Sequence, residues 1–507
     1  MSKINKLRKG DVLGSGAYGK VYEAESQQGR RFAVKRILVD DSGDNFIDSL
    51  READIVSRFV HPHIIRTSVQ WGSPFGTPLS PTLNGYKDDS ISFVMEIAKG
   101  DAKAYKNGTG YNIMDIKTLM VHGLLGLEYL HHNKVTHQDI KTQNILYCDT
   151  EYGPVFKISD LGLAYWNNKF GYRAELISTS WYRAPEIVRN NVYGTKDIYD
   201  TKVDIWSMGC VMFEFLMGYP LMRSIDRDDN TLISAEMDKL IPNYRQGGGP
   251  IVTWDMFWRK HKCNIMDEIP QYRSFLESML EYDPSKRKSA TELLSHPFLL
   301  SHQHYIATVR LKHPLQSDIY PLVDIPSTQE RVFACNTAVN IINNRPDLVS
   351  DNYRTLFHAL RLFETYISYQ VTNIPRKYDH ISANNGHYWS YGGCVVRFMT
   401  CFYIMNKYFS LLKKPHSWDS LLEPKYKTEE YMKLAKDTEK FVVAAIFKYN
   451  VYSHTVIDVA GHLNIALTDD YIKQIFMTYI KHQWINISVY GILQHCINII
   501  NTSLKKR

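Results

Sequence analysis

The sequence has no hydrophobic run long enough to cross a bilayer, and this absence argues against a membrane protein. The apolar stretch Phe441 to Phe447 is far shorter than the ~20 residues that a spanning helix needs. The N-terminal stretch Met1 to Asp11 is polar and has no apolar core of a secretory signal. We therefore expect no membrane association and a location in the cytoplasm or nucleus.

Cysteine is scarce and poorly spaced for cross-linking or metal binding. The seven cysteines are scattered, odd in number and form no C-x-x-C pair, so neither a disulfide framework nor a zinc site is expected. A strong excess of one charge is also missing. The net charge of +7 is small for 507 residues and does not indicate a nucleic-acid-binding protein. The basic tail 501–507 is expected to be a solvated terminus.

The length and composition indicate a multidomain globular protein. A chain of 507 residues is too long for one hydrophobic core, and roughly two to four domains are expected. The hydrophobic content of 44% and the charged content of 22% are ordinary for globular proteins. The motifs that carry recognisable chemistry all lie in residues 1–300, whereas the remainder shows helical periodicity.

A glycine-rich stretch, Gly14 to Val21, lies between two β-rich runs. Glycines let backbone amides approach phosphates without a Cβ in the way. A lone G-x-G-x-x-G fits a hairpin turn or a dinucleotide-binding loop, and the latter expects a helix directly afterwards. Here Lys20 to Ala24 alternates like a strand, which favours a hairpin that covers phosphates.

Lys35 ends the next predicted strand, Phe32 to Lys35, directly after the glycine hairpin. A buried ammonium group requires an acidic partner. Glu52 supplies one from a predicted helix, Asn45 to Phe59. Each residue alone would be read as an exposed surface charge, and it is their combination that indicates a phosphate-binding pair.

The stretch 137–144 carries an acid, a lysine and an amide at a spacing that suits phosphoryl transfer. Asp139 can accept a hydrogen bond from a substrate hydroxyl, and Lys141 can neutralise charge on the transferring group. Asn144 offers a hard oxygen ligand for magnesium, and Asp160, after a short predicted strand, can hold magnesium between phosphates. A glycine loop followed in order by these residues is very improbable by chance.

Together these motifs resemble those of a eukaryotic-type protein kinase. The resemblance implies an α+β, bilobal kinase fold over residues 1–300, with a β-rich small lobe over about 1–98 and an α-rich large lobe over about 99–300. It also implies ATP and Mg²⁺ as cofactors and protein hydroxyls as substrates. Lys141, two residues after Asp139, is the form found in serine/threonine kinases.

The same resemblance assigns further roles. The implied catalytic residues are Lys35, Glu52, Asp139, Lys141, Asn144, Asp160 and Thr179, with Asn144 and Asp160 as metal ligands. The implied ATP-binding residues are Leu13, Gly14, Ser15, Gly16, Ala17, Tyr18, Gly19, Lys20, Val21, Ala33, Lys35, Met95, Glu96, Ala98 and Asp101. The implied structural residues are Glu186 of an A-P-E motif, Asp204 of a D-x-W-S-x-G motif, and Arg287, which is expected to pair with Glu186.

Within protein kinases the chain resembles the cyclin-dependent group. Residues 181–186 read W-Y-R-A-P-E, residues 141–144 match K-P-Q-N with Thr142 in place of proline, and 296–298 read H-P-F. Leu50-Arg51-Glu52 resembles the end of the group's regulatory helix.

The departures from that group concern a phosphorylation switch. Phosphorylation-activated relatives gather three arginines around a phosphothreonine. Here only Arg51 remains, because Gln138 and Tyr165 occupy the other two positions, and residues 165–177 contain no serine or threonine. We expect activity without threonine phosphorylation in this segment, although Tyr172 leaves tyrosine regulation open.

Residues 301–328 contain three prolines and little periodicity, and we expect a linker there. Beyond it we expect an all-α bundle over 329–500. The predicted helices are Gln329 to Asn343, Asp351 to Gln370, Gly392 to Leu412, Glu429 to Tyr449, Thr455 to Leu463, Asp469 to Gln483 and Ser488 to Ile500.

Three stretches of this region, 355–368, 394–410 and 438–451, resemble helices of the cyclin box, although a helical bundle of another kind stays open. By the resemblance, Lys407 and Glu439 sit where cyclins bind the kinase's regulatory helix, and Leu50 is the candidate contact toward them. The chain would then carry its own activator as an intramolecular partner. Two alternatives are a pseudokinase scaffold and an active kinase whose C-terminal bundle is an adaptor that recruits substrate.

Overall fold

The protein is described here by a computed structural model. The residues that it describes are 7–16, 19–38, 59–71, 90–109, 113–166, 179–193, 200–222, 230–241, 270–313, 322–325, 329–345, 353–373, 391–409, 421–429, 431–435, 469–479 and 484–488, with single residues or pairs between them. They belong to two compact units. The first unit runs to Leu315 apart from 168–171, and the second begins at Gln316.

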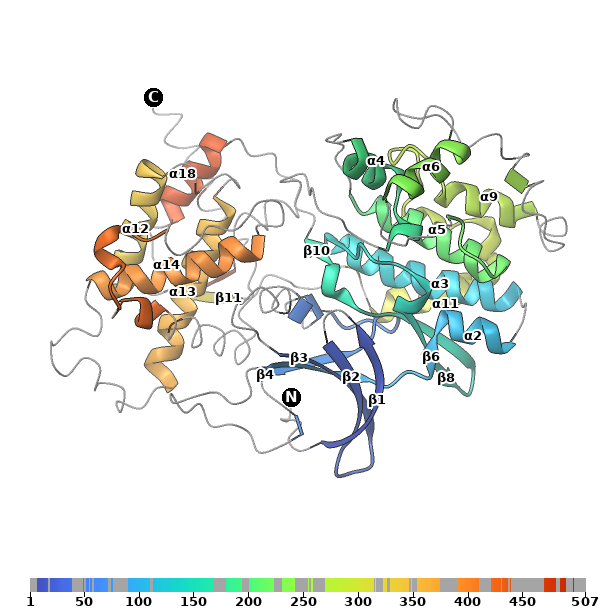
Figure 1. Cartoon of the computed structure of the whole chain (residues 1–507), viewed down its shortest axis with the longest axis horizontal. Helices are drawn as coiled ribbons and strands as arrows, with labels where there is room; N and C mark the ends of the chain where they lie inside the picture. The colour runs from blue at the N-terminus through green and yellow to red at the C-terminus, as the bar shows by residue number, and fades with distance from the viewer. Residues whose placement is uncertain are drawn as a thin grey trace. The chain divides into compact units, whose positions relative to one another are not determined.

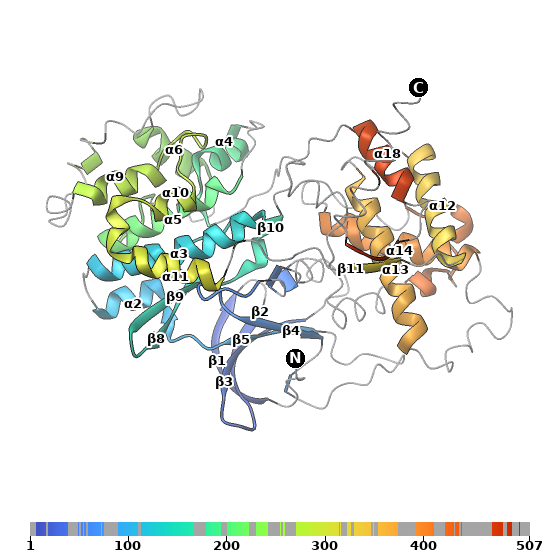
Figure 2. The ribbon, with the colours of Figure 1, turned by 180° about the vertical axis from the view of Figure 1, so that it is seen from behind.

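The first unit opens with a five-stranded antiparallel sheet in the order β1-β2-β3-β5-β4 (Figures 1 and 2). Its strands are β1 (Arg8–Gly16), β2 (Gly19–Glu25), β3 (Arg31–Leu38), β4 (Thr67–Trp71) and β5 (Ser90–Glu96). The central strands β3 and β5 are rich in β-branched and aromatic residues, which suit a pleated sheet surface. Val34, Ile91 and Phe93 are accordingly buried.

Helices dominate the rest of this unit. They are α2 (Ala102–Thr109), α3 (Ile113–His132), α4 (Pro185–Tyr193), α5 (Lys202–Met217), α6 (Asn230–Leu240), α9 (Pro270–Met279) and α10 (Ala290–Leu294). The short strands are β6 (Gly100–Asp101), β8 (Ile145–Thr150) and β9 (Gly153–Ile158) in one sheet, and β7 (Val135–Thr136) paired with β10 (Tyr165–Trp166). The unit thus has the β-rich lobe followed by the α-rich lobe that the sequence predicted.

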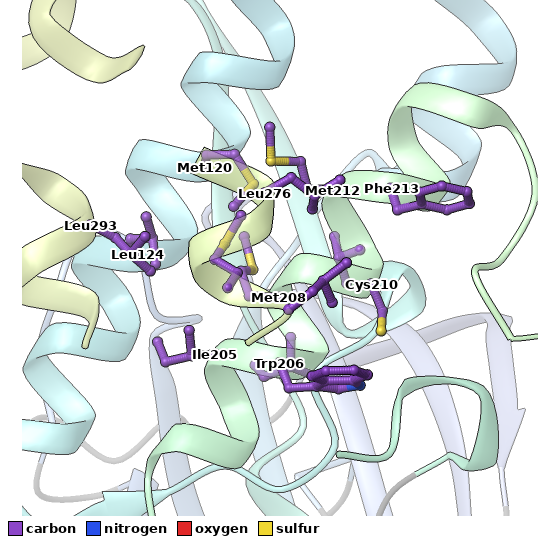
Figure 3. Close-up of a cluster of buried hydrophobic side chains, with 14 of the residues drawn as sticks. Met120, Leu124, Ile205, Trp206, Met208, Cys210, Met212, Phe213, Leu276 and Leu293 are labelled. Carbon is purple, nitrogen blue, oxygen red and sulfur yellow. The ribbon is translucent and has the colours of Figure 1, made fainter. Parts of the chain in front are cut away.

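The core of the helical lobe lies between α3 and α5. Both helices are apolar on nearly all sides, a composition typical of fully buried helices. Figure 3 shows Met120 and Leu124 of α3 beside Met208 and Met212 of α5, with Leu276 of α9 packed against them. In the part of the chain that the structure describes, no helix has the length and apolar character that a bilayer span requires.

The prediction of a linker over residues 301–328 is wrong for its first half. After a 3-10 turn, η5 (Pro297–His302), the chain forms helix α11 (Gln303–Lys312), which belongs to the first unit. Arg310 of α11 pairs with Glu128 of α3 (Nη2–Oε1 2.6 Å), so the helix packs onto the large lobe. The sequence of α11 shows little apolar periodicity, because several of the residues that contact the lobe are polar.

Helices form most of the described part of the second unit. They are α12 (Gln329–Asn344), α13 (Arg354–Asn373), α14 (Tyr391–Phe409) and α18 (Asp469–Tyr479), with a 3-10 turn η8 (Pro424–Tyr426). Polar residues also occupy its interior. Arg331 of α12 donates to Glu364 of α13 (Nε–Oε1 2.7 Å), and Tyr479 of α18 donates to the same carboxylate (3.1 Å).

The second unit also contains two strands, so the prediction of an all-α domain is wrong. β11 (Leu322–Ile325) pairs antiparallel with β12 (Trp484–Ser488). Ser488, the predicted start of a helix to Ile500, therefore ends a strand, and most of 489–500 lies outside the described residues. Of the predicted helix Thr455 to Leu463 nothing lies within them.

Candidate active site

Lys35 and Glu52 form a buried ion pair, as the sequence predicted. Strand β3 holds Lys35 between Val21 and Phe93 of the neighbouring strands. Its Nζ donates to both oxygens of Glu52 (2.8 and 2.9 Å) and to Oδ1 of Asp160 (3.1 Å). Burial alone would lower the pKa of this ammonium, but the charges of the two carboxylates outweigh it, and the pKa is raised. The group is therefore a fixed positive charge.

Asp160 follows β9 at a sharp change of chain direction. Its φ of 59° lies in the left-handed region, which costs a non-glycine residue about 1–3 kcal/mol. Burial alone would raise the pKa of its carboxyl group, but the charge of Lys35 outweighs that and lowers it, so the side chain is ionised. The side chain remains 41% exposed, which leaves room for a ligand.

The Asp139 carboxylate is held by donors on both oxygens. Oδ1 accepts from the backbone N–H and the hydroxyl of Thr179 (both 3.0 Å). Oδ2 accepts from Nζ of Lys141 (2.6 Å) and from Nδ2 of Asn144 (2.9 Å). Lys141 also donates to the Thr179 hydroxyl (3.0 Å). These four residues, predicted separately from two motifs, therefore form one hydrogen-bonded group.

A buried carboxylate on α5 fixes the backbone of this loop. Asp204 accepts from the N–H groups of His137 and Gln138 (both 2.8 Å) and contacts Nε2 of His131 (2.8 Å). Gln138 is buried and has a φ of 68°, so the loop turns there in a left-handed conformation. The structural role predicted for Asp204 is thus visible as an anchor of the loop that carries Asp139.

Asn144 and Asp160 have the donor set that magnesium prefers. Asn144 donates through Nδ2 to the carbonyl and to Oδ2 of Asp139, which leaves its amide oxygen available as a ligand. Asp160 has one carboxylate oxygen on Lys35 and an exposed side chain. Carboxylate and amide oxygens are hard ligands that suit Mg²⁺, usually together with water and phosphate oxygens. The residues present therefore fit a magnesium ion.

The glycine-rich stretch forms the β1–β2 hairpin that its sequence predicted. Gly14 lies opposite Val21, and Gly16 lies opposite Gly19. Gly19 has a φ of 136°, and a Cβ there would lie 2.6 Å from the carbonyl oxygen of Arg36, so no other residue fits. Leu13 is half exposed beside the turn, and the side chains of 15–18 lie outside the described residues.

Three of the residues assigned to ATP binding lie at the end of strand β5 or just after it. Met95 and Glu96 are its last two residues, and Ala98 lies two residues beyond. Ala33 is buried opposite Met95 in the β3–β5 register. The Glu96 side chain is committed elsewhere, because it accepts from Nζ of Lys157 (2.7 Å) and from the backbone of Arg66 (2.7 Å). Its backbone N–H is engaged as well, because it donates to the carbonyl of Arg66 (3.1 Å).

Asp101, another residue assigned to ATP binding, accepts from the N–H of Ala104 (2.7 Å). The carboxylate is therefore engaged at the start of α2, a position in which side-chain acceptors stabilise a helix. Ala98 lies in the short connection between β5 and α2.

Arg287 and Glu186 form the predicted structural pair. Two guanidinium nitrogens of Arg287 donate to the two oxygens of Glu186 (2.9 and 3.1 Å), and the Arg287 side chain is fully buried. Further donations reach the carbonyls of Glu281 and Lys202 (both 2.8 Å), and the guanidinium stacks over Trp206 (5.2 Å).

Sequence reasoning missed the role of Thr142. Its hydroxyl donates to Glu214 (3.2 Å) and lies 3.2 Å from the hydroxyl of Tyr182, which in turn donates to Glu214. The substitution of the usual proline at this position was the available signal. Among the predicted regulatory contacts, Leu50, Arg51 and Glu439 and the side chain of Lys407 lie outside the described residues.

Comparison with known proteins assigns the family. Residues 7–299 match the protein kinase domain, and the chain belongs to the protein kinase family. Cyclin-dependent kinase G-2 of Oryza sativa subsp. indica is 30% identical over 316 residues, which are 58% of this chain and 41% of the relative. The chain thus spans less than half of this relative.

Two further relatives are also protein kinases by name. The probable cyclin-dependent kinase 10 of Dictyostelium discoideum is 28% identical over 324 residues, 59% of this chain and 80% of that protein. A serine/threonine-protein kinase of Saccharomyces cerevisiae (strain ATCC 204508 / S288c) is 30% identical over 325 residues, 58% of this chain and 47% of that protein. The kinase domain is therefore similar to those of cyclin-dependent kinases.

Proposed function

We propose that the protein is an ATP-dependent serine/threonine kinase that transfers the γ-phosphate to protein hydroxyls. The observation that carries the proposal is the group of Asp139, Lys141 and Thr179. A carboxylate held from three sides in one orientation can accept the proton of a substrate hydroxyl and aim it for in-line attack. Lys141, 2.6 Å from that carboxylate, is placed to offset negative charge on the transferring group.

The remaining residues bind and orient the nucleotide. The Lys35 ammonium, fixed by Glu52, is a charged donor for phosphate oxygens. The β1–β2 hairpin supplies backbone N–H groups above the phosphates. Asn144 and Asp160 would hold magnesium, which would offset negative charge on the phosphates.

We further propose that activity does not require threonine phosphorylation in the segment after Asp160. Gln138 and Tyr165 stand where phosphorylation-activated relatives have arginines, so a phosphate would find little positive charge. Tyr165 instead pairs with Thr136 in the β10–β7 ladder. Two of the arginines that would bind the phosphate and the threonine that would carry it are both missing, which supports loss of this switch.

One assay tests both statements. The purified chain is treated with a phosphatase, the phosphatase is removed, and transfer from γ-labelled ATP to a mixed Ser/Thr/Tyr peptide pool is followed. We expect label on serine and threonine at an unchanged rate, and no transfer when EDTA removes magnesium. Label only on tyrosine would contradict the serine/threonine specificity, and no label at all would contradict kinase activity. A rate lost on dephosphorylation and traced to residues 165–179 would contradict the absence of the switch.

We also propose that the second unit is a cyclin-like activator acting in cis. Its helices resemble cyclin-box helices, and Lys407 and Glu439 are the proposed contacts toward Leu50 of the regulatory helix. Tethering gives an effective concentration near millimolar, which is enough for a weak interface to stay occupied. Activation would consist of holding the helix that carries Glu52 in place.

Deletion of residues 316–507 is expected to lower activity on a generic peptide about 5–150-fold, the usual range of coupling between sites. The cut falls after Leu315 because α11 belongs to the first unit. Thermal unfolding of the fragment checks that it is folded, and adding the second unit back in trans is the matched control. A fully active fragment would refute activation in cis. A fragment that loses activity only on the natural substrate would identify the second unit as an adaptor.

A further inference from the structure

Residues 59–65 connect the helix that carries Glu52 to strand β4, and they are fastened to strand β9. The N–H of Ile158 donates to the carbonyl of His63 (2.9 Å), and the N–H of Ile65 donates to the carbonyl of Ile158 (2.8 Å). A movement of this segment therefore displaces the end of β9 as well.

The same segment lies very close to α3. A Cβ at Gly126 of α3 would come within 2.8 Å of the His63 carbonyl oxygen and 2.9 Å of the Ile158 side chain. Phe59, at the start of the segment, meets Tyr129 of α3 edge to face at 5.7 Å. The segment is thus a tightly fitted contact between the small lobe and the large lobe.

Two stacked histidines hold both polar groups of one residue on β9. His63 donates from Nδ1 to the carbonyl of Phe156 (3.0 Å), and His122 accepts from the N–H of Phe156 at its Nδ1 (3.1 Å). The two imidazole rings stack at 4.1 Å with an 18° tilt. A third histidine, His61, stacks on Tyr129 at 4.9 Å.

The hydrogen bonds require these rings to be neutral. Nδ1 of His122 accepts from Phe156, and Nδ1 of His61 accepts from the N–H of His63 (3.2 Å), so neither nitrogen carries a proton. Burial accordingly lowers the pKa of both His61 and His122 to about 3. Burial also lowers the pKa of His63 well below its usual value, so this ring carries a single proton. That proton lies on Nδ1, which donates to the Phe156 carbonyl, and Nε2 is therefore an acceptor.

Helix α11 supplies the donor for that nitrogen. The hydroxyl of Tyr305 lies 2.9 Å from Nε2 of His63 and donates to it. One turn and a half further along, Arg310 donates from Nε and Nη2 to both oxygens of Glu128 on α3 (2.9 and 2.6 Å). Glu128 is almost fully buried, so this bidentate pair fixes the helix where Tyr305 can reach His63.

We propose that α11 is a brace for the catalytic site, in which Tyr305 positions the segment 59–65 through His63. The brace affects both carboxylates that pair with Lys35, those of Glu52 and Asp160. The segment follows the helix that carries Glu52, and the strand fastened to it runs directly into Asp160. Both carboxylates meet at Lys35. The effect on catalysis rests on the proposed kinase function, whereas the effect on the segment does not.

The test uses the full chain with Tyr305→Phe, which removes one hydroxyl and keeps the ring. Tyr152→Phe is the matched control, because Tyr152 is 92% exposed. Hydrogen–deuterium exchange is measured on peptides covering 59–65 and 153–160, with α5 as the internal reference. We expect faster exchange in both peptides for Tyr305→Phe only. Equal exchange in the two variants would overturn the brace, whether or not the protein is an active kinase.

Steady-state kinetics on the same proteins test the consequence for catalysis. We expect kcat to fall about 2–30-fold in Tyr305→Phe, the usual effect of a residue that acts through others, with the KM for peptide unchanged. A fall in thermal stability with unchanged kcat would assign Tyr305 a merely structural role and overturn the positioning claim.

Variants of Arg310 provide a second and independent route. Arg310→Gln is expected to reproduce both effects, and Arg310→Lys to restore them in part, because a lysine can still pair with Glu128. Loss of exchange protection with Arg310→Gln but not with Tyr305→Phe would show that α11 acts without His63, which contradicts the proposal.

Discussion

Replacement of Asp139 by asparagine is expected to lower kcat by about 10²–10⁴-fold, the range typical of loss of a positioned acid or base. Asparagine has the same shape, so the change removes the negative charge and one acceptor while leaving the side chain in place. In the wild-type protein the Asp139 carboxylate accepts hydrogen bonds from Lys141, Asn144 and the Thr179 hydroxyl. With an amide in its place, one of these donors faces an NH₂ group and the substrate hydroxyl loses its acceptor.

The KM for ATP separates this effect from misfolding. Asp139 makes no predicted contact with the nucleotide, so the KM for ATP should stay within a few-fold of the wild-type value while kcat falls. Asp149→Asn is the matched control, since it changes an exposed aspartate in a surface pair with Lys99. An Asp139→Asn protein with wild-type kcat would show that Asp139 does not accept the substrate proton, and it would remove the observation on which the proposed mechanism rests.

Replacement of Arg287 by methionine is expected to destabilise the first unit by about 3–5 kcal/mol, the usual cost of removing one partner from a buried ion pair. Methionine fills much of the volume but leaves the Glu186 carboxylate buried without its charge partner. The carbonyls of Glu281 and Lys202 also lose their donor. Urea unfolding of the full chain, followed through tryptophan fluorescence, measures the change.

Two companion variants test the cause of that loss. Lys286→Met is the control, because Lys286 is a neighbouring cation whose side chain is 74% exposed, and it should leave the transition unchanged. Adding Glu186→Leu to Arg287→Met should recover part of the stability, because the stranded charge disappears. An Arg287→Met protein as stable as wild type would show that the pair contributes nothing net to folding.

The candidate site is largely predictable from the sequence because its motifs are short and their chemistry is local. The glycine hairpin and the short strand before Asp160 both lie where the residue pattern predicted them. The pairing of Lys35 with Glu52 also followed, since a buried ammonium needs an acid and a helix nearby offered one. These are cases in which neighbouring residues or simple charge balance decide the structure.

The features that escaped prediction depend on contacts between distant residues. Helix α11 has too little apolar periodicity to be recognised, and its position depends on Glu128, far away in sequence. The contact of His63 with Tyr305 joins residues that no sequence pattern links. Strand β11 was expected to be part of the linker, and β12 was expected to lie between two helices except for Ser488. A two-stranded ladder of four or five residues leaves little periodicity to detect.

The pairing of β11 with β12 has a consequence for biosynthesis. The two strands are roughly 160 residues apart in sequence, and β12 leaves the ribosome long after β11. At a synthesis rate of about 5–20 residues per second, that delay is on the order of ten seconds or more. The first unit, which ends at Leu315, is complete before the delay begins. For that interval each nascent chain carries a finished first unit and a β11 strand that still waits for its partner.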